Sequence, residues 1–218
     1  MNLSGDARTL WDAAMGLDRA RAAVSTATIS ARPLPPMLFL TDPERTPEPW
    51  RTARSLPGGA AVVYRAFGAE DAEHVGRRLR EITARRGLIL LVGLDADLAE
   101  RIGADGLHLP EHALSSAVTL RARYPDWLMT GAVHSLDAVS TADSDALDAL
   151  VLSPVFPAGG PSSRKAALGE KTLGDIVRSS RLPVYALGGV GVETVGRLAG
   201  SGACGFAAVE AIARAFVA

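Results

Sequence analysis

The sequence predicts a single α/β domain of the (β/α)8 TIM-barrel class, with a helical extension at its N-terminus. Eight short apolar runs follow one another from Met37 onward, and amphipathic segments separate them. The runs are apolar on both faces, which is typical of parallel strands covered by helices. No Gly-x-Gly-x-x-Gly motif follows the first run, which favours a closed barrel over a doubly wound open sheet; periodicity alone leaves both architectures open.

The order of the elements follows from the same patterns. The predicted strands are Met37–Leu40, Ala60–Tyr64, Leu88–Val92, Gly106–Leu109, Leu128–Ala132, Ala149–Leu152, Val184–Leu187 and Gly205–Ala208. Helical periodicity separates them over Ala69–Arg85, Asp95–Ile102, Ala113–Tyr124, Leu136–Ala142, Leu173–Ser180, Val192–Gly200 and Val209–Phe216. The first crossover, around Glu44–Ser55, carries the weakest pattern.

Residues 1–35 precede this repeating unit. Apolar residues at helical spacing predict a helix over Leu10–Val24, and the prolines from Pro33 onward prevent its continuation. We therefore expect an N-terminal helical extension over residues 1–35 and a barrel over residues 36–218. The extension could cover one end of the barrel or mediate self-association, for example as a homodimer.

Composition excludes several classes of protein. The chain has 218 residues and a formal net charge of -1, so its bulk charge indicates neither nucleic acid nor a membrane surface as a partner. The single cysteine, Cys204, excludes an internal disulfide and a cysteine-based metal cluster. No signal peptide and no apolar run of membrane-spanning length is evident, so a cytoplasmic protein is expected.

The carboxyl ends of the strands are where a barrel places its reactive groups. After the seventh strand, Gly188 and Gly189 allow close approach of the backbone to a ligand, and with Ala208 and Val209 after the eighth strand they predict a phosphate site. A tight turn is the alternative explanation of the two glycines. Glu210 stands against the phosphate site, because its carboxylate would repel a phosphate at the same helix terminus.

Two side chains at strand ends have catalytic potential. His134 ends the fifth strand and can accept and donate a proton near neutral pH without a metal. Arg65 ends the second strand and can bind a phosphate or carboxylate with two hydrogen bonds, although an ion pair with a neighbouring acid is equally consistent with it. No pair of histidines has the spacing of metal ligands, so no metal site is predicted.

Further residues are candidates for the substrate pocket. They are Thr41 after the first strand, His108 in the fourth strand, Ser153 and Pro154 after the sixth strand, and Lys165 at the end of the following loop. A buried structural histidine is an equal interpretation of His108. The loop from Ser153 to Lys165 is rich in Gly, Pro and Ser and ends in two cations, which suits either a lid over an anion or a plain surface loop.

These residues resemble the superfamily of thiamine phosphate synthase and TenI, a thiazole tautomerase. The likeness extends from about Pro36 to Phe216. It rests on five short motifs in the same order and spacing: Leu38-Phe39-Leu40-Thr41-Asp42, Gly103-Ala104-Asp105-Gly106-Leu107-His108-Leu109, Leu152-Ser153-Pro154-Val155-Phe156-Pro157, Ala186-Leu187-Gly188-Gly189-Val190 and Gly205-Phe206-Ala207-Ala208-Val209. The resemblance implies a (β/α)8 barrel and a small phosphorylated ligand, either thiazole phosphate or thiamine phosphate.

The sequence departs from the synthase pattern at the acidic residues that hold magnesium. By register, Gly93-Leu94 stands where synthases carry Asn-Asp, and Ala113 stands where they carry a second acid. Phe67 stands where synthases carry a lysine after the arginine of the second strand, and that arginine is kept here as Arg65. Without those ligands the resemblance implies Mg²⁺ only if the synthase interpretation holds, and no other cofactor is firmly implied.

Three hypotheses follow from this comparison. The stretch Val133-His134-Ser135 resembles TenI, in which the matching histidine is the proposed acid/base, so the first hypothesis is a TenI-like enzyme acting on thiazole phosphate carboxylate. The second is a thiamine phosphate synthase, coupling hydroxymethylpyrimidine diphosphate to thiazole phosphate, with an atypical metal site. The third is a non-catalytic ligand-binding or regulatory paralogue.

Overall fold

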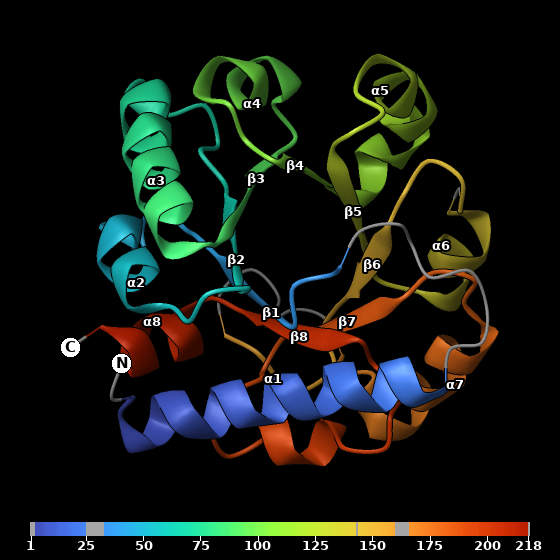
Figure 1. Ribbon diagram of the computed structural model, residues 1–218. Helices are drawn as coiled ribbons and strands as arrows, with labels where there is room; N and C mark the ends of the chain where they lie inside the picture. Colours follow the sequence, from blue (N-terminus) through green and yellow to red (C-terminus); the bar gives the residue numbers. More distant parts are fainter. Residues whose placement is uncertain (1–2, 25–32, 143, 160–165, 218) are drawn as a thin grey trace.

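The computed structural model describes residues 3–24, 33–142, 144–159 and 166–217, and in it eight parallel strands close into a barrel in chain order. The strands are β1 (Met37–Leu40), β2 (Ala61–Tyr64), β3 (Ile89–Gly93), β4 (Gly106–Leu109), β5 (Leu128–Val133), β6 (Ala149–Leu152), β7 (Val184–Leu187) and β8 (Gly205–Ala208). β1 pairs with β8 through Leu38 and Ala207, which completes the ring (Figure 1). The predicted barrel is confirmed, and five of the eight strands have the predicted bounds.

Helices surround the barrel on its outside (Figure 1). They are α1 (Gly5–Val24), α2 (Pro49–Ser55), α3 (Ala72–Arg86), α4 (Ala96–Ile102), the 3-10 helix η1 (Glu111–Ser116), α5 (Ala117–Arg123), α6 (Leu136–Thr141), α7 (Gly169–Ser179), the 3-10 helix η3 (Val195–Leu198) and α8 (Glu210–Phe216). The expected helix over Val192–Gly200 is wrong for most of its length, because the only helical residues there are the 3-10 turn η3. Two glycines inside that segment, Gly196 and Gly200, disfavour a regular α-helix.

Alternation along each strand divides the apolar residues between two cores. One core fills the barrel and contains Leu38, Val63 and Tyr185 among its buried residues. The other lies between strands and helices and contains Phe39 and Val62, the neighbours of the first two in sequence. Successive side chains of a strand point to opposite faces, so strands buried on both faces require apolar residues at every position.

The N-terminal helix α1 belongs to the outer layer of the barrel. It contacts β8, α8 and η3, and its buried residues Leu10 and Ala14 join the core between strands and helices. In Figure 1, α1 lies along the outside of the barrel next to β8. The segment between β7 and β8 forms only the short η3 instead of a full-length helix, and α1 covers this part of the barrel wall. The Ser4 hydroxyl also donates to the carbonyl of Ala215 (3.1 Å), which places the two ends of the described chain side by side.

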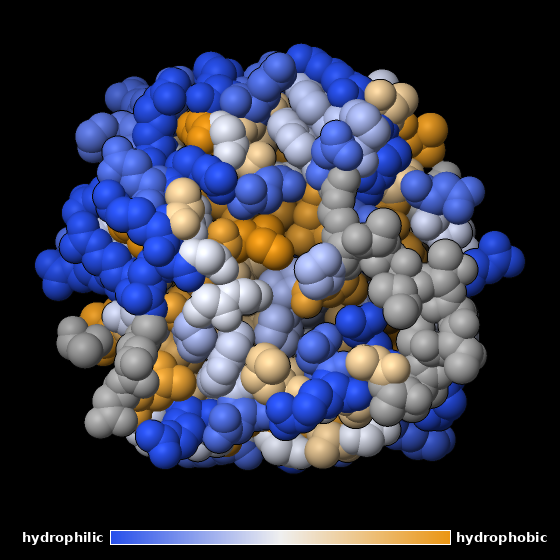
Figure 2. Space-filling view, viewed as in Figure 1, coloured by the Kyte–Doolittle hydropathy of each residue, from blue (hydrophilic) through white to orange (hydrophobic). Residues whose placement is uncertain are grey.

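The surface has the distribution expected of this layered fold. In the view of Figure 2, hydrophilic residues cover most of the outer helices, and hydrophobic residues gather in the hollow at the centre. Within the described ranges, no helix has both the length and the hydropathy that crossing a membrane requires.

Candidate functional site

The inward-facing rows of the strands lead to a set of polar side chains at the carboxyl ends of the barrel. Ala61 and Val63 of β2 point into the barrel, and Arg65, two residues after Val63, continues this inward-facing alternation just past the end of the strand. His108 lies inward on β4, beside Thr130 of β5. Because side chains alternate along a strand, these groups face the barrel axis rather than the outer helices.

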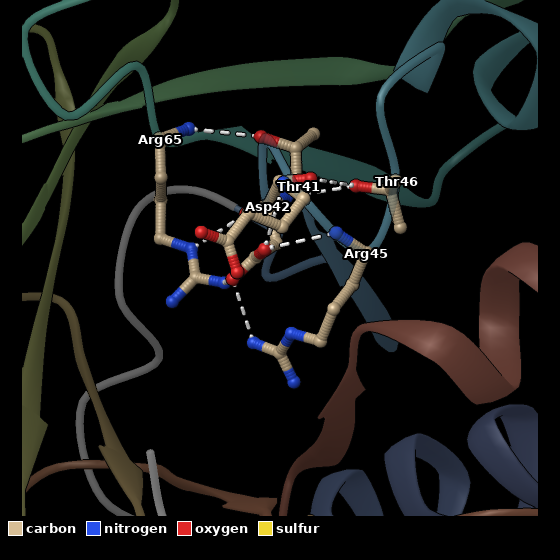
Figure 3. A network of polar contacts seen from close by, with 6 residues as sticks. Thr41, Asp42, Arg45, Thr46 and Arg65 are labelled. Carbon is tan, nitrogen blue, oxygen red and sulfur yellow. Dashed lines mark hydrogen bonds and ion pairs between the residues drawn. The ribbon is translucent and has the colours of Figure 1, made fainter. Parts of the chain in front are cut away.

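Thr41 and Asp42 hold Arg65 in place (Figure 3). The Arg65 amide donates to the Thr41 hydroxyl (3.0 Å), and Arg65 Nε donates to the Thr41 carbonyl (2.7 Å). Arg65 Nη2 lies 3.5 Å from Asp42 Oδ2, and among the described residues this buried nitrogen has no hydrogen-bond partner. Thr41 therefore acts on the site by orienting Arg65.

The electrostatics of this pair keep both groups charged. Burial lowers the pKa of Arg65 to about 10, although the charge of Asp42 opposes that shift. Burial raises the pKa of Asp42, but hydrogen bonds from Arg45 and the charges of Arg45 and Arg65 outweigh it, so the pKa falls below the ordinary 3.8. At neutral pH the site presents a guanidinium that is partly removed from water.

Gly188 and Gly189 make a sharp turn against the loop that follows β6. Their φ angles are 94° and 64°, in the left-handed region that favours glycine. A Cβ on Gly188 would lie 2.8 Å from Pro154 Cα, and the Gly188 carbonyl accepts a hydrogen bond from the Phe156 amide (2.9 Å). The glycines thus serve close packing of two loops in addition to any ligand.

The structure brings five of the predicted site residues to one cavity of about 280 Å³. These residues are Arg65, Gly188, Gly189, Ala208 and Val209. Glu210 also borders the cavity, and its Oε2 lies 3.8 Å from Arg214 Nη2. Arg214 borders the same cavity, so a cation as well as the Glu210 carboxylate stands there.

His108 is buried in the barrel, and Thr130 is its polar partner. His108 Nδ1 lies 2.9 Å from Thr130 Oγ1. Burial lowers the pKa of His108 to about 4, and the charge of Arg65 adds to the shift. The imidazole is therefore neutral at pH 7, and it does not border the cavity described above.

His134 lies at the rim of the barrel and is held by Glu111 of η1. One carboxylate oxygen, Glu111 Oε2, accepts hydrogen bonds from the His134 amide (2.7 Å) and lies 2.9 Å from His134 Nδ1. A carboxylate is an acceptor only, so this contact places the proton of a neutral imidazole on Nδ1. Nε2 then carries a free lone pair and has no hydrogen-bond partner within the described part of the chain.

The remaining candidates lie along the β6 loop. Ser153 is buried, its amide donates to the Val133 carbonyl (3.1 Å), and the bond from Ser153 to Pro154 is cis. Pro154 packs on Gly188. Lys165 lies outside the described residues.

Two contacts of the site were not predicted from the sequence. Arg45 borders the cavity, and it comes from the first crossover, where the sequence pattern is weakest. Glu111 holds His134 although 23 residues separate the two in sequence. The contact between Glu111 and His134 follows from the pairing of β4 with β5. Glu111 begins η1 just after β4, and His134 comes just after β5, so the two residues lie at neighbouring strand ends.

The carboxylates described near the barrel mouth are already engaged by other protein groups. Mg²⁺ prefers oxygen ligands, and carboxylates are its usual protein donors. Among residues 3–24, 33–142, 144–159 and 166–217, no three His, Cys, Asp or Glu side chains form a group that could hold a metal. The nearby carboxylates have protein partners: Asp42 pairs with Arg45, Asp95 caps α4, and Glu111 accepts from His134.

Comparison with known proteins places the chain in a family. Residues 38–212 match the family model described as thiamine monophosphate synthase. A putative thiamine-phosphate synthase 2 of Aquifex aeolicus is 30% identical over 155 residues, which are 70% of this chain and 82% of that protein. A thiamine-phosphate synthase of Pyrococcus horikoshii is 28% identical over 179 residues, which are 81% of this chain and 86% of that protein.

A solved structure agrees with these relatives. The thiamine phosphate pyrophosphorylase from Pyrococcus furiosus superposes with a TM-score of 0.70 at 25% identity, covering 83% of this chain and 91% of that chain. The family match spans the whole barrel from β1 into α8, including both glycines and the strand ends that form the cavity. The chain therefore belongs to the thiamine monophosphate synthase family, and the resemblance noted in its sequence is confirmed.

Proposed function

We propose that this chain is a TenI-like enzyme of thiamine biosynthesis, which isomerises thiazole phosphate carboxylate by acid/base chemistry at His134. The observation that carries the proposal is the contact between His134 Nδ1 and Glu111 Oε2 at 2.9 Å. It leaves Nε2 as a base at the barrel mouth, where substrates of this fold bind. Glu111 is a positioning residue, because it acts through the imidazole.

The proposed reaction requires proton movement alone. His134 Nε2 takes a proton from one carbon of the substrate, and the imidazolium so formed returns a proton to another carbon. The composition of the substrate and the protonation state of the enzyme are therefore unchanged. Arg65, Gly188 and Gly189, with the Ala208–Val209 backbone, would hold the phosphate in the cavity of about 280 Å³. That volume lies near the lower end for small-molecule sites and suits a compact monophosphate.

Thiamine phosphate synthase activity is the second candidate. The similarity to proteins named thiamine-phosphate synthases favours it. The carboxylates at the mouth weigh against it, since Asp42 and Glu111 already have protein partners that a magnesium ion would have to displace.

Two assays on one preparation separate these functions. We expect the purified protein to isomerise thiazole phosphate carboxylate in the presence of EDTA, and we expect His134→Gln to lower kcat by roughly 100-fold or more, as for loss of a general acid/base. The exposed His112→Gln is the matched control and should keep full activity. Efficient coupling of hydroxymethylpyrimidine diphosphate to thiazole phosphate with Mg²⁺ would overturn the proposal in favour of the synthase.

The role of Glu111 has its own test. Glu111→Ala should lower kcat with little change in KM, because it frees the imidazole to adopt other orientations and tautomers. Glu111→Gln retains an acceptor oxygen and should recover part of that loss. Equal activity of both variants and the wild-type protein would show that the contact at 2.9 Å does not serve catalysis.

A further inference from the structure

Arg45 reaches the cavity because the loop after β1 folds back on itself. The Thr46 amide donates to the Asp42 carbonyl (2.8 Å), and the Asp42 amide donates to the Thr46 hydroxyl (2.7 Å). Within this turn the Arg45 amide donates to Asp42 Oδ1 (3.1 Å), and Arg45 Nη2 donates to Asp42 Oδ2 (2.8 Å). Figure 3 shows both contacts, with the side chain of Arg45 extending toward that of Asp42.

Two guanidinium groups converge on the same carboxylate oxygen. Asp42 Oδ2 lies 2.8 Å from Arg45 Nη2 and 3.5 Å from Arg65 Nη2. The second distance is too long for a good hydrogen bond, which agrees with the buried Arg65 Nη2 having no hydrogen-bond partner among the described residues. A buried donor without a partner is costly. The Arg65 side chain also lines the cavity, where the part of its guanidinium that is still accessible can meet an anionic oxygen.

The charges around the cavity have an excess of cations. Arg45, Arg65 and Arg214 border it, and Glu210 is the only acid among the described residues that line it. Asp42 stands beside them and neutralises one further cation. One net positive charge remains, and the turn at Gly188 and Gly189 lines the same cavity. This combination favours an anion of low charge.

We propose that Arg45 and Arg65 bind the phosphate of the ligand directly, and that the cavity accepts a phosphate monoester without a divalent cation. The Asp42 carboxylate holds the two guanidinium groups side by side, because the Nη2 atoms of both arginines approach the same oxygen, Oδ2. Guanidinium groups suit this task because their planar forks donate two parallel hydrogen bonds to phosphate oxygens. This inference rests on the phosphate site of the proposed function and adds Arg45 to it as a direct ligand of the phosphate.

Phosphate binding tests the inference without any catalytic step. Titration calorimetry with inorganic phosphate would compare the wild-type protein in EDTA and in Mg²⁺, and we expect the two dissociation constants to agree within about twofold. Loss of a charge-assisted hydrogen bond in Arg45→Gln should weaken phosphate binding by roughly 10- to 100-fold. The matched control Arg51→Gln removes an exposed arginine of α2 that pairs with Glu48, the residue just before that helix, and should bind as the wild type does.

Further variants keep the test decisive. Arg45→Lys retains the charge without the planar fork and should bind phosphate with intermediate affinity, and thermal unfolding would verify that each variant is folded. Pyrophosphate, with its higher charge, should bind no more tightly than phosphate in EDTA. Wild-type affinity in a folded Arg45→Gln variant, absence of binding in EDTA, or binding only with Mg²⁺ would each overturn the inference.

The outcome is separable from that of the proposed function. His134→Gln should bind phosphate as tightly as the wild-type protein, because His134 does not border the cavity. A protein that binds phosphate through Arg45 but lacks isomerase activity would refute the proposed reaction alone. A protein that isomerises its substrate but binds phosphate equally well without Arg45 would refute this inference alone.

Discussion

The buried imidazole of His108 makes the stability of the barrel dependent on pH. Burial and the charge of Arg65 lower its pKa from 6.5 to about 4 in the folded protein. In the unfolded chain the pKa returns to about 6.5. Between pH 6.5 and pH 4 the unfolded state therefore binds more protons than the folded state, and the free energy of unfolding falls as the pH decreases through that window.

The size of the effect follows from the two pKa values. Each pKa unit corresponds to about 1.4 kcal/mol, so lowering the pH from 7 to 5 removes about 2 kcal/mol of unfolding free energy through His108 alone. The lowered pKa of Asp42 acts in the same direction at lower pH, because that carboxylate stabilises the fold only while it is ionised. A comparison with a variant is therefore needed to isolate the histidine.

Urea unfolding at pH 7 and at pH 5 provides the measurement. His108→Asn keeps a donor close to Thr130 and removes the titrating group, so its loss of unfolding free energy between the two pH values should be smaller than that of the wild type by about 2 kcal/mol. The exposed His74→Gln on α3 is the control and should follow the wild type. Equal losses in the wild type and His108→Asn would refute the assignment of His108 as a buried neutral imidazole.

Two further predictions concern the stability of the barrel. Leu94 has a φ of 65° and is 51% exposed. Leu94→Gly should therefore leave the free energy of unfolding unchanged or raise it by up to about 1 kcal/mol. As a control in the same denaturation series, Leu136→Gly removes a 53% exposed leucine from α6 and should lower the free energy of unfolding by about 0.5 to 1 kcal/mol. Asp148 accepts hydrogen bonds from the Met129 amide (2.7 Å) and from Arg121 (2.7 Å), so Asp148→Ala should cost about 2 to 3 kcal/mol in chemical unfolding. A cost below about 1 kcal/mol, as expected for an exposed ion pair, would contradict the importance of that contact.

Much of the architecture was determined by the sequence itself. A strand buried on both faces requires consecutive apolar residues, so β1, β4 and β6 to β8 could be predicted to the residue. The glycines after β7 were predictable for a similar reason, because a turn with positive φ at Gly188 and Gly189 needs glycine at those two positions.

Other features depended on segments that meet only when the barrel closes. The helix expected over Val192–Gly200 is a short 3-10 turn, and α1, from the other end of the chain, packs on β8 beside it. The sequence indicated that α1 is a helix, since periodicity is a property of consecutive residues. Its location could not be predicted, because packing against β8 depends on contacts almost 200 residues apart.

The candidate site divides in the same way. Strand-end position alone pointed to Arg65 and His134, because the carboxyl ends of parallel strands share one face of the barrel. Their partners were decided by the tertiary structure: Arg45 reaches Asp42 through a turn closed by side-chain hydrogen bonds, and Glu111 meets His134 across neighbouring strands. The physical reason is that periodicity and turn preferences operate within a few residues, whereas the meeting of charged groups from different loops requires the closed ring of strands to bring those loops together.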